Sequence, residues 1–256
     1  MVPRLAVATE NGAEVSLYYE DYGVGSPVVL VAGWPLTAQS WESQVAAFVE
    51  AGHRVVGYDR RGFGRSTRAW GGYDQDTLAA DLHLLLEHLD LRGAALVGFS
   101  SGAGDVARCV ARFGVGRVSR LVLAGPLAVD DGLVRDLLNA AGWHRVAMLD
   151  DVLGRFFSVD GEVVLDEASR QHLLHVAACA SPKATVDVIG AWAGADPEAD
   201  LADVGVPVLV VHGERDAFTA PRRGRAPATI IPSAPHGAPM THPQQWNEVV
   251  LRFLSP

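Results

Sequence analysis

The stretch that decides the fold reads Leu96-Val97-Gly98-Phe99-Ser100-Ser101-Gly102-Ala103-Gly104. An apolar run that predicts a buried strand enters Gly-x-Ser-x-Gly, and a helical pattern follows over 103–113. So sharp a strand-to-helix turn strains the central residue, and the flanking glycines relieve the crowding around it. The turn raises the Ser100 hydroxyl above the sheet at a helix N-terminus, whose dipole favours negative charge. The glycine spacing selects Ser100, rather than Ser101, as candidate nucleophile; the alternative is a glycine-rich turn with a capping serine.

Strand and helix patterns alternate on both sides of this stretch. The predicted strands cover 27–32, 54–58, 94–97, 118–123, 206–211 and 229–231, and the predicted helices cover 41–50, 77–89, 103–113 and 246–254. Residues 14–19 alternate after Asn11-Gly12, which predicts an antiparallel edge hairpin. The alternation predicts an α/β fold with a mostly parallel central sheet flanked by helices.

Residues 131–202 interrupt this alternation. Their pattern is helical, β-branched runs are few, and the segment lies between two predicted core strands. We expect an inserted helical cap subdomain over a core formed by residues 1–130 and 203–256.

The composition limits the class of protein. The 256 residues carry a formal net charge of −9, with 49% hydrophobic and 20% charged residues, which is typical of a globular domain. The acidic balance disfavours nucleic acid as a partner, because phosphates would be repelled. No apolar stretch suits a membrane span or a signal peptide, so a cytoplasmic location is expected. Cys109 and Cys179 imply no disulfide framework and are expected to be buried free thiols.

A serine hydroxyl needs a base, and after an elbow of this kind the acid and then the histidine follow along the chain. His236 lies between a proline and a glycine after the last predicted strand, on a loop that can reach back over the sheet. We therefore expect His236 to be the base. Other histidines have less specific interpretations: His83 and His88 fall on a predicted helix, His172 and His175 in the cap, and His53 and His242 at the surface or in turns. His212 precedes a glycine at a strand end and is expected to be structural.

The acid is expected after a late strand. Asp216 follows the strand over 206–211 and would hold the imidazole in the correct tautomer. Glu214 lies closer to the strand end, as solvated turn residues often do. Asp130 or Asp131, one strand earlier, is the other alternative.

An oxyanion formed at a carbonyl carbon needs two N–H donors. One is expected from Ser101, directly after the nucleophile. The second is expected from the loop Gly33-Trp34-Pro35-Leu36, where Trp34 is the candidate because Pro35 has no N–H. A role of Trp34 as a core aromatic is compatible with this one.

Five stretches share a family resemblance: Gly33-Trp34-Pro35-Leu36, Tyr58-Asp59-Arg60-Arg61-Gly62-Phe63-Gly64-Arg65-Ser66, Gly98-Phe99-Ser100, His212-Gly213-Glu214-Arg215-Asp216 and Ala234-Pro235-His236-Gly237. They resemble the α/β-hydrolase superfamily, and more narrowly its cofactor-free haloperoxidase, perhydrolase and aryl esterase group. The likeness covers residues 14–125 and 205–255 and is weak in the cap. It implies the α/β-hydrolase fold and a serine hydrolase that acts on a small ester, thioester or lactone through an acyl-enzyme. The resemblance also implies that no metal or organic cofactor is required. It further implies a perhydrolase side activity, because a proline at the position of Pro35, next to the oxyanion residue, resembles the perhydrolase form.

The chain departs from the family pattern at three places. Ala32 stands where a histidine usually buttresses the oxyanion loop, and Ser101 replaces an apolar residue and could touch the substrate. The segment from Asp216 to His236 is short, with Arg222, Arg223 and Arg225 in place of a helix. This shortening could displace Asp216 or His236, or open one side of the pocket.

The cap is expected to shape a mostly apolar pocket for a small-molecule substrate. The candidate pocket residues, each also compatible with simple packing, are Pro35, Phe99, Trp143, Phe157, Trp192 and Ala238. Two other functions stay open: a cofactor-free cyclase, lyase or C–C hydrolase in a biosynthetic pathway, and a non-catalytic small-molecule-binding module. A homo-oligomer also stays open.

Overall fold

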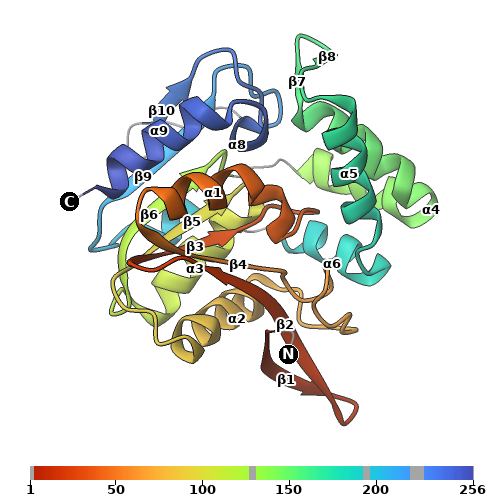
Figure 1. Cartoon of the computed structure of the whole chain (residues 1–256). Coiled ribbons are helices and arrows are strands. Elements are labelled where there is room, and N and C mark those ends of the chain that lie inside the picture. The colour runs from red at the N-terminus through yellow and green to blue at the C-terminus, as the bar shows by residue number, and fades with distance from the viewer. Residues whose placement is uncertain (1–2, 127–130, 193–196, 220–227, 256) are drawn as a thin grey trace.

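The computed structural model describes residues 3–126, 131–192, 197–219 and 228–255. Within them, an eight-stranded sheet forms the centre of the molecule, in the order β1-β2-β4-β3-β5-β6-β9-β10 (Figure 1). Its strands are β1 (Arg4–Glu10), β2 (Ala13–Tyr22), β3 (Ser26–Val31), β4 (His53–Tyr58), β5 (Ala94–Phe99), β6 (Val118–Ala124), β9 (Val208–Gly213) and β10 (Ala228–Ile231). From β4 to β10 all neighbours pair in parallel, which confirms the predicted sheet.

An antiparallel hairpin forms one edge of the sheet, as the sequence predicts. Strand β1 pairs with β2, and β2 pairs antiparallel with β4. Asn11 and Gly12 both have positive φ, at 50° and 77°, as a two-residue hairpin turn of the primed type requires. The long strand β2 therefore connects the hairpin to the parallel part of the sheet.

Helices cover both faces of the parallel strands. Successive residues of β3 contribute to different apolar clusters, Val28 and Leu30 to one and Val29 and Val31 to the other, so one cluster lies on each face. Helices α1 (Glu42–Glu50) and α9 (Pro243–Leu254) pack on the first face, and α2 (Gln75–His88) and α3 (Ser101–Phe113) pack on the second. The short helices η1 (Ala38–Trp41) and α8 (Ala238–Thr241) lie close to α1.

The segment between β6 and β9 forms a largely helical layer beside the carboxyl ends of the strands (Figure 1). It contains α4 (Asp131–Phe156), β7 (Ser158–Val159), β8 (Glu162–Val163), α5 (Glu167–Ala178), α6 (Pro182–Ala191) and α7 (Pro197–Asp200). Helix α4 is kinked at His144. The last helix, α7, packs on core helix α3, where Arg108 Nη1 donates to Asp200 Oδ1 at 2.9 Å.

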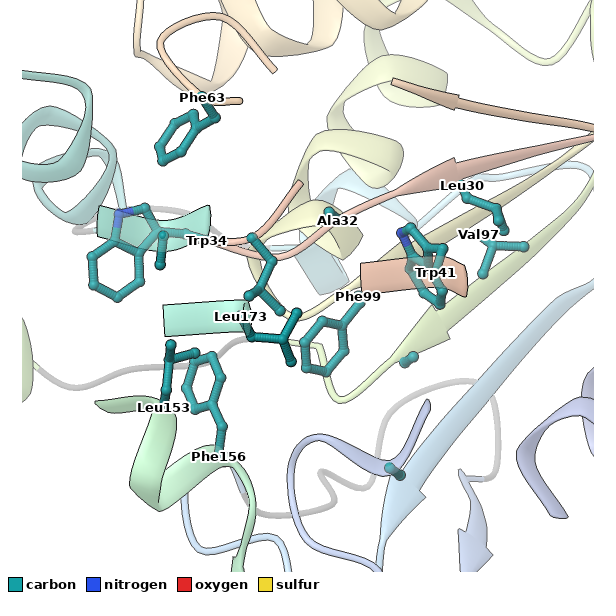
Figure 2. Packing of buried hydrophobic residues seen from close by; sticks show 14 of the residues in the cluster. Leu30, Ala32, Trp34, Trp41, Phe63, Val97, Phe99, Leu153, Phe156 and Leu173 are labelled. Carbon is teal, nitrogen blue, oxygen red and sulfur yellow. The ribbon is translucent and has the colours of Figure 1, made fainter. Parts of the chain in front are cut away.

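The inner surface of this cap continues the first apolar cluster. Figure 2 shows Leu153, Phe156 and Leu173 of the cap lying beside Phe99 and Trp34 of the core. All five side chains are buried. The cap and the sheet therefore share one apolar layer directly above the strand ends.

The two cysteines differ in exposure. Cys109 on α3 is buried, and burial raises the pKa of its thiol to about 12. Cys179 is exposed, so the prediction that it is buried is wrong; it caps the C-terminus of α5, where the chain leaves the packed face. Across the described ranges, no helix combines the length and the apolar character needed to cross a membrane.

Candidate active site

The turn between β5 and α3 forces Ser100 into an uncommon backbone conformation. Its φ is 53° and its ψ is −119°, and its amide donates to the Ala124 carbonyl at 2.8 Å. A Cβ on Gly98 would lie 2.4 Å from the Gly102 carbonyl oxygen, and one on Gly102 would lie 2.5 Å from that of Val31. The strand and helix approach so closely that only glycine fits at either position, which is the reason for the Gly-x-Ser-x-Gly pattern.

Three predicted residues meet at this turn. His236 Nε2 lies 3.0 Å from Ser100 Oγ, and His236 Nδ1 lies 2.9 Å from Asp216 Oδ2. The His236 and Asp216 side chains are fully buried. These distances match the nucleophile–base–acid arrangement of a catalytic triad. The shortened Asp216–His236 segment displaces neither residue, and its three arginines lie outside the described residues.

Asp216 is held by several donors besides His236. Its Oδ1 accepts hydrogen bonds from the amides of Phe218 and Thr219, each at 2.8 Å, and its Oδ2 accepts one from Thr219 Oγ1 at 2.9 Å. Burial acts to raise the pKa of Asp216, but His212, His236 and the Thr219 amide outweigh it and hold that pKa well below its usual value. The carboxylate therefore stays ionised and can stabilise a charged imidazole.

Of the alternative acids, the structure describes the Glu214 side chain, which bonds away from His236. Glu214 accepts a hydrogen bond from the Ser233 amide at 2.9 Å. Asp130 and the side chain of Asp131 lie outside the described part of the chain. Among the described carboxylates, only Asp216 is within hydrogen-bond distance of His236.

Aromatic rings surround the His236 imidazole. The ring of Phe156 lies 4.7 Å from it, that of Phe99 lies 5.0 Å and that of Phe218 lies 5.4 Å, measured between centroids. Phe156 also fixes the loop, because its carbonyl accepts from the Gly237 amide at 2.8 Å. Phe218 was not predicted; its position two residues after Asp216 is the signal that could have found it. These rings exclude water and strengthen the electrostatic interactions within the triad.

The predicted oxyanion residues Trp34 and Ser101 are brought together in an unexpected way. The Trp34 amide donates to the side-chain oxygen of Ser101 at 2.8 Å. The same oxygen accepts from Arg60 Nη1 at 3.2 Å, and that nitrogen also lies 3.2 Å from Asp105 Oδ2. Arg60 and Asp105 were not predicted, and no local pattern marks a buried ion pair whose members lie 45 residues apart.

The predicted pocket residues divide into two groups. Pro35, Phe99, Phe157 and Ala238 are buried, and Trp192 packs edge to face on Trp34 with ring centroids 5.1 Å apart. Trp192 also borders a cavity of about 20 Å³ beside Ser101, Arg60 and Asp105. Trp143 on α4 is 86% exposed, which corrects its assignment to a buried pocket. It directly precedes the kink at His144.

Metal ligands do not gather in the described part of the molecule. Within it, no group of three or more histidine, cysteine, aspartate or glutamate side chains could hold a metal ion.

Comparison with known proteins places this arrangement in a family. Residues 26–179 match the model of the alpha/beta hydrolase fold family. A putative non-heme chloroperoxidase of Synechocystis is 40% identical over 99% of this chain and 100% of that protein. A bifunctional esterase/perhydrolase of Acinetobacter calcoaceticus is 34% identical over 97% of this chain and 98% of that protein.

A solved structure of a similar protein supports the same family. The crystal structure of a bromoperoxidase from Bacillus anthracis is 38% identical, with a TM-score of 0.91 over 99% of both chains. The chain therefore belongs to the α/β-hydrolase fold family and, within it, to the haloperoxidase and perhydrolase group of hydrolase-like enzymes.

Proposed function

We propose that this protein is a serine hydrolase that cleaves small esters, thioesters or lactones through an acyl-enzyme on Ser100. One observation carries the proposal: a continuous chain runs from Ser100 Oγ to His236 Nε2 at 3.0 Å and from His236 Nδ1 to Asp216 Oδ2 at 2.9 Å. The relatives named as esterase and perhydrolase support the same chemistry.

In the first half of the proposed reaction, Ser100 Oγ attacks the acyl carbon while His236 accepts its proton. Charge develops on the carbonyl oxygen near the N-terminus of α3, whose dipole favours it. His236 then protonates the leaving alkoxide, and the acyl group stays on Ser100. In the second half His236 deprotonates a water, which attacks the acyl carbon and releases the acid and the free serine.

Perhydrolysis is the second part of the proposal. Hydrogen peroxide attacks the same acyl-enzyme in place of water, its proton passes to His236, and a peracid leaves. The relative named as a bifunctional esterase/perhydrolase supports this part of the proposal.

A test uses p-nitrophenyl acetate and butyrate with the wild-type protein and Ser100→Ala. We expect wild-type turnover, a loss of at least about a thousandfold in Ser100→Ala, and one fluorophosphonate adduct on Ser100. Ser119→Ala is the matched control, because the Ser119 hydroxyl bonds, among the described residues, only to the Gly93 carbonyl at 2.7 Å. A folded wild-type protein with neither turnover nor labelling would favour the binding module instead.

A second readout separates hydrolysis from the cyclase, lyase or C–C hydrolase alternative. Rapid acid quench during turnover should trap the acyl group on Ser100, seen as a mass increase on the peptide that contains it. With peroxide added, peracid should form at the expense of acid. Turnover without an acyl adduct in quenched samples would contradict the acyl-enzyme.

A further inference from the structure

The Trp34 amide, a predicted oxyanion donor, is bonded to the side chain of Ser101. Its Oγ accepts the Trp34 N–H at 2.8 Å, a full hydrogen bond, and Arg60 Nη1 donates to the same oxygen at 3.2 Å. A substrate oxygen cannot share this place with Oγ. The Trp34 amide can therefore reach a substrate only if Ser101 moves, or it must act through Ser101.

The Ser101 hydroxyl can still donate a hydrogen bond. A hydroxyl offers two acceptor lone pairs and one donor. Within the described residues, both hydrogen bonds of Oγ use it as an acceptor, so its hydrogen can be donated to a substrate. Donors on both lone pairs polarise the O–H bond and make it a stronger donor, as in other hydrogen-bonded chains.

Arg60 carries a positive charge that is only partly compensated. The residue is 2% exposed, and only Nη1 contacts Asp105. Nε and Nη2 of Arg60 are buried and have no hydrogen-bond partner among the described residues, whereas the same two atoms of neighbouring Arg61 both bond to Asp81. Burial also raises the pKa of Asp105, against the effect of Arg60. In such a buried site the field of an incompletely paired cation extends to its neighbours.

We propose that the Ser101 side-chain hydroxyl donates a hydrogen bond to the oxyanion, and that Trp34 N–H and Arg60 polarise and hold it. The assignment rests on the proposed acyl-transfer function and adds a side-chain donor to it. Ser101 would contact the reacting atoms directly, and Arg60 would act as a positioning residue through it. The Ser101 backbone amide keeps its place as the other donor.

The first test compares Ser101→Ala, Ser101→Thr and the control Ser119→Ala in ester hydrolysis. Loss of one oxyanion donor typically lowers kcat by about a hundredfold. We expect that loss in Ser101→Ala with KM changed less than about threefold, since the oxyanion exists only after attack. Ser101→Thr should retain most activity because it keeps the hydroxyl. Phosphonate titration of active sites corrects for misfolded protein.

An unchanged or higher kcat in Ser101→Ala is the contrary outcome. A kcat in Ser101→Ala equal to or above that of the wild type would mean that Oγ merely covers the Trp34 amide, and would overturn the assignment. The proposed function would survive that result, since wild-type turnover and Ser100 labelling establish it separately. A wild type without turnover and labelling would instead overturn the proposed function, and this assignment with it.

The second test asks whether Arg60 works through Ser101. The double variant Arg60→Met, Asp105→Asn removes both charges, so no unpaired ion is left buried. We expect kcat to fall about tenfold when Ser101 is present and to change little in the Ser101→Ala background, as coupled residues do. Arg61→Met, Asp81→Asn is the matched control, and it should lower the melting temperature without changing kcat per active site. Equal losses in both backgrounds would overturn the role of Arg60.

Arg60→Lys gives a second measurement if the double variant is poorly folded. A lysine keeps the charge but not the planar donor geometry. With Ser101 present, we expect the kcat of Arg60→Lys to lie between those of the wild type and the double variant. In the Ser101→Ala background, Arg60→Lys should leave kcat unchanged. A Lys effect that persists without Ser101 would again contradict the assignment.

Discussion

The Nδ1 atom of His212 lies 3.6 Å from Oδ2 of Asp216, the same oxygen that bonds His236 at 2.9 Å. The longer distance exceeds that of a good hydrogen bond, and His212 Nδ1 has no hydrogen-bond partner among the described residues. His212 therefore contributes an electrostatic contact from the end of β9, four residues before Asp216. We expected this histidine to be structural, and its place against Asp216 shows which group it supports.

Replacing His212 should have a mild effect on catalysis. His212→Phe keeps the ring volume and removes the polar contact, while the Phe218 and Thr219 amides still hold Asp216. We expect kcat/KM to fall by less than about tenfold, against about ten-thousandfold for Asp216→Asn. Steady-state kinetics on one aryl ester measures both. Equal losses in the two variants would show that His212 is essential to the acid.

The low pKa of Asp216 predicts a pH dependence of stability. Burial opposes ionisation, but the contact with His212 and the hydrogen bond from His236 outweigh it, so the folded-state pKa of Asp216 lies below the ordinary value. Such a group contributes stability that is fully present above about pH 4, the ordinary aspartate pKa. That stability is lost as the pH falls toward the folded-state pKa.

Urea unfolding of the wild type and Asp216→Asn at several pH values checks this sign. The wild type should be more stable by about 2 kcal/mol near neutrality, and the difference should shrink below about pH 4. A stability difference that widens as the pH falls would contradict the assignment of the charge.

Gly125 lies where an added side chain would press on the base. Its φ is 49°, and a Cβ there would lie 3.2 Å from His236 Nδ1 and Cε1. We expect Gly125→Ala to cost at least about 1 kcal/mol of stability and to lower kcat by displacing the imidazole. Gly114→Ala is the control, because Gly114 also has a positive φ but no atom within 4 Å of an added Cβ. A similar loss of activity in both variants would point to backbone strain alone.

The two cap tryptophans should differ in their effect on specificity. Trp192 packs on Trp34 and borders the cavity beside Ser101, whereas Trp143 is 86% exposed. Trp192→Ala should change KM across p-nitrophenyl esters of increasing acyl length by about tenfold or more, since a lost apolar contact weighs about 1–3 kcal/mol. Trp143→Ala should leave the profile unchanged. A flat profile in Trp192→Ala would remove this residue from the pocket.

Much of the fold could be predicted because the signals are local. The β3 and β5 strands are buried on both faces and so read as continuous apolar runs, and Asn11-Gly12 specifies its turn by itself. Cys179 and Trp143 are exposed, although the sequence predicts that both face the interior. Exposure at a helix end or beside a kink depends on tertiary packing, which a local pattern does not specify. The contact between α7 and α3 likewise joins segments that carry no common pattern.

The sequence by itself determined the elbow around Ser100 and the chain order of Asp216 and His236, because the backbone crowding that requires glycine and the strand–loop alternation are both local properties. Only the tertiary structure decided what surrounds them. The ion pair of Arg60 and Asp105 and the hydrogen bond from the Trp34 amide to Ser101 both join residues that lie far apart in the sequence. Their partners are set by how the strands and the cap pack, which no spacing along the chain encodes.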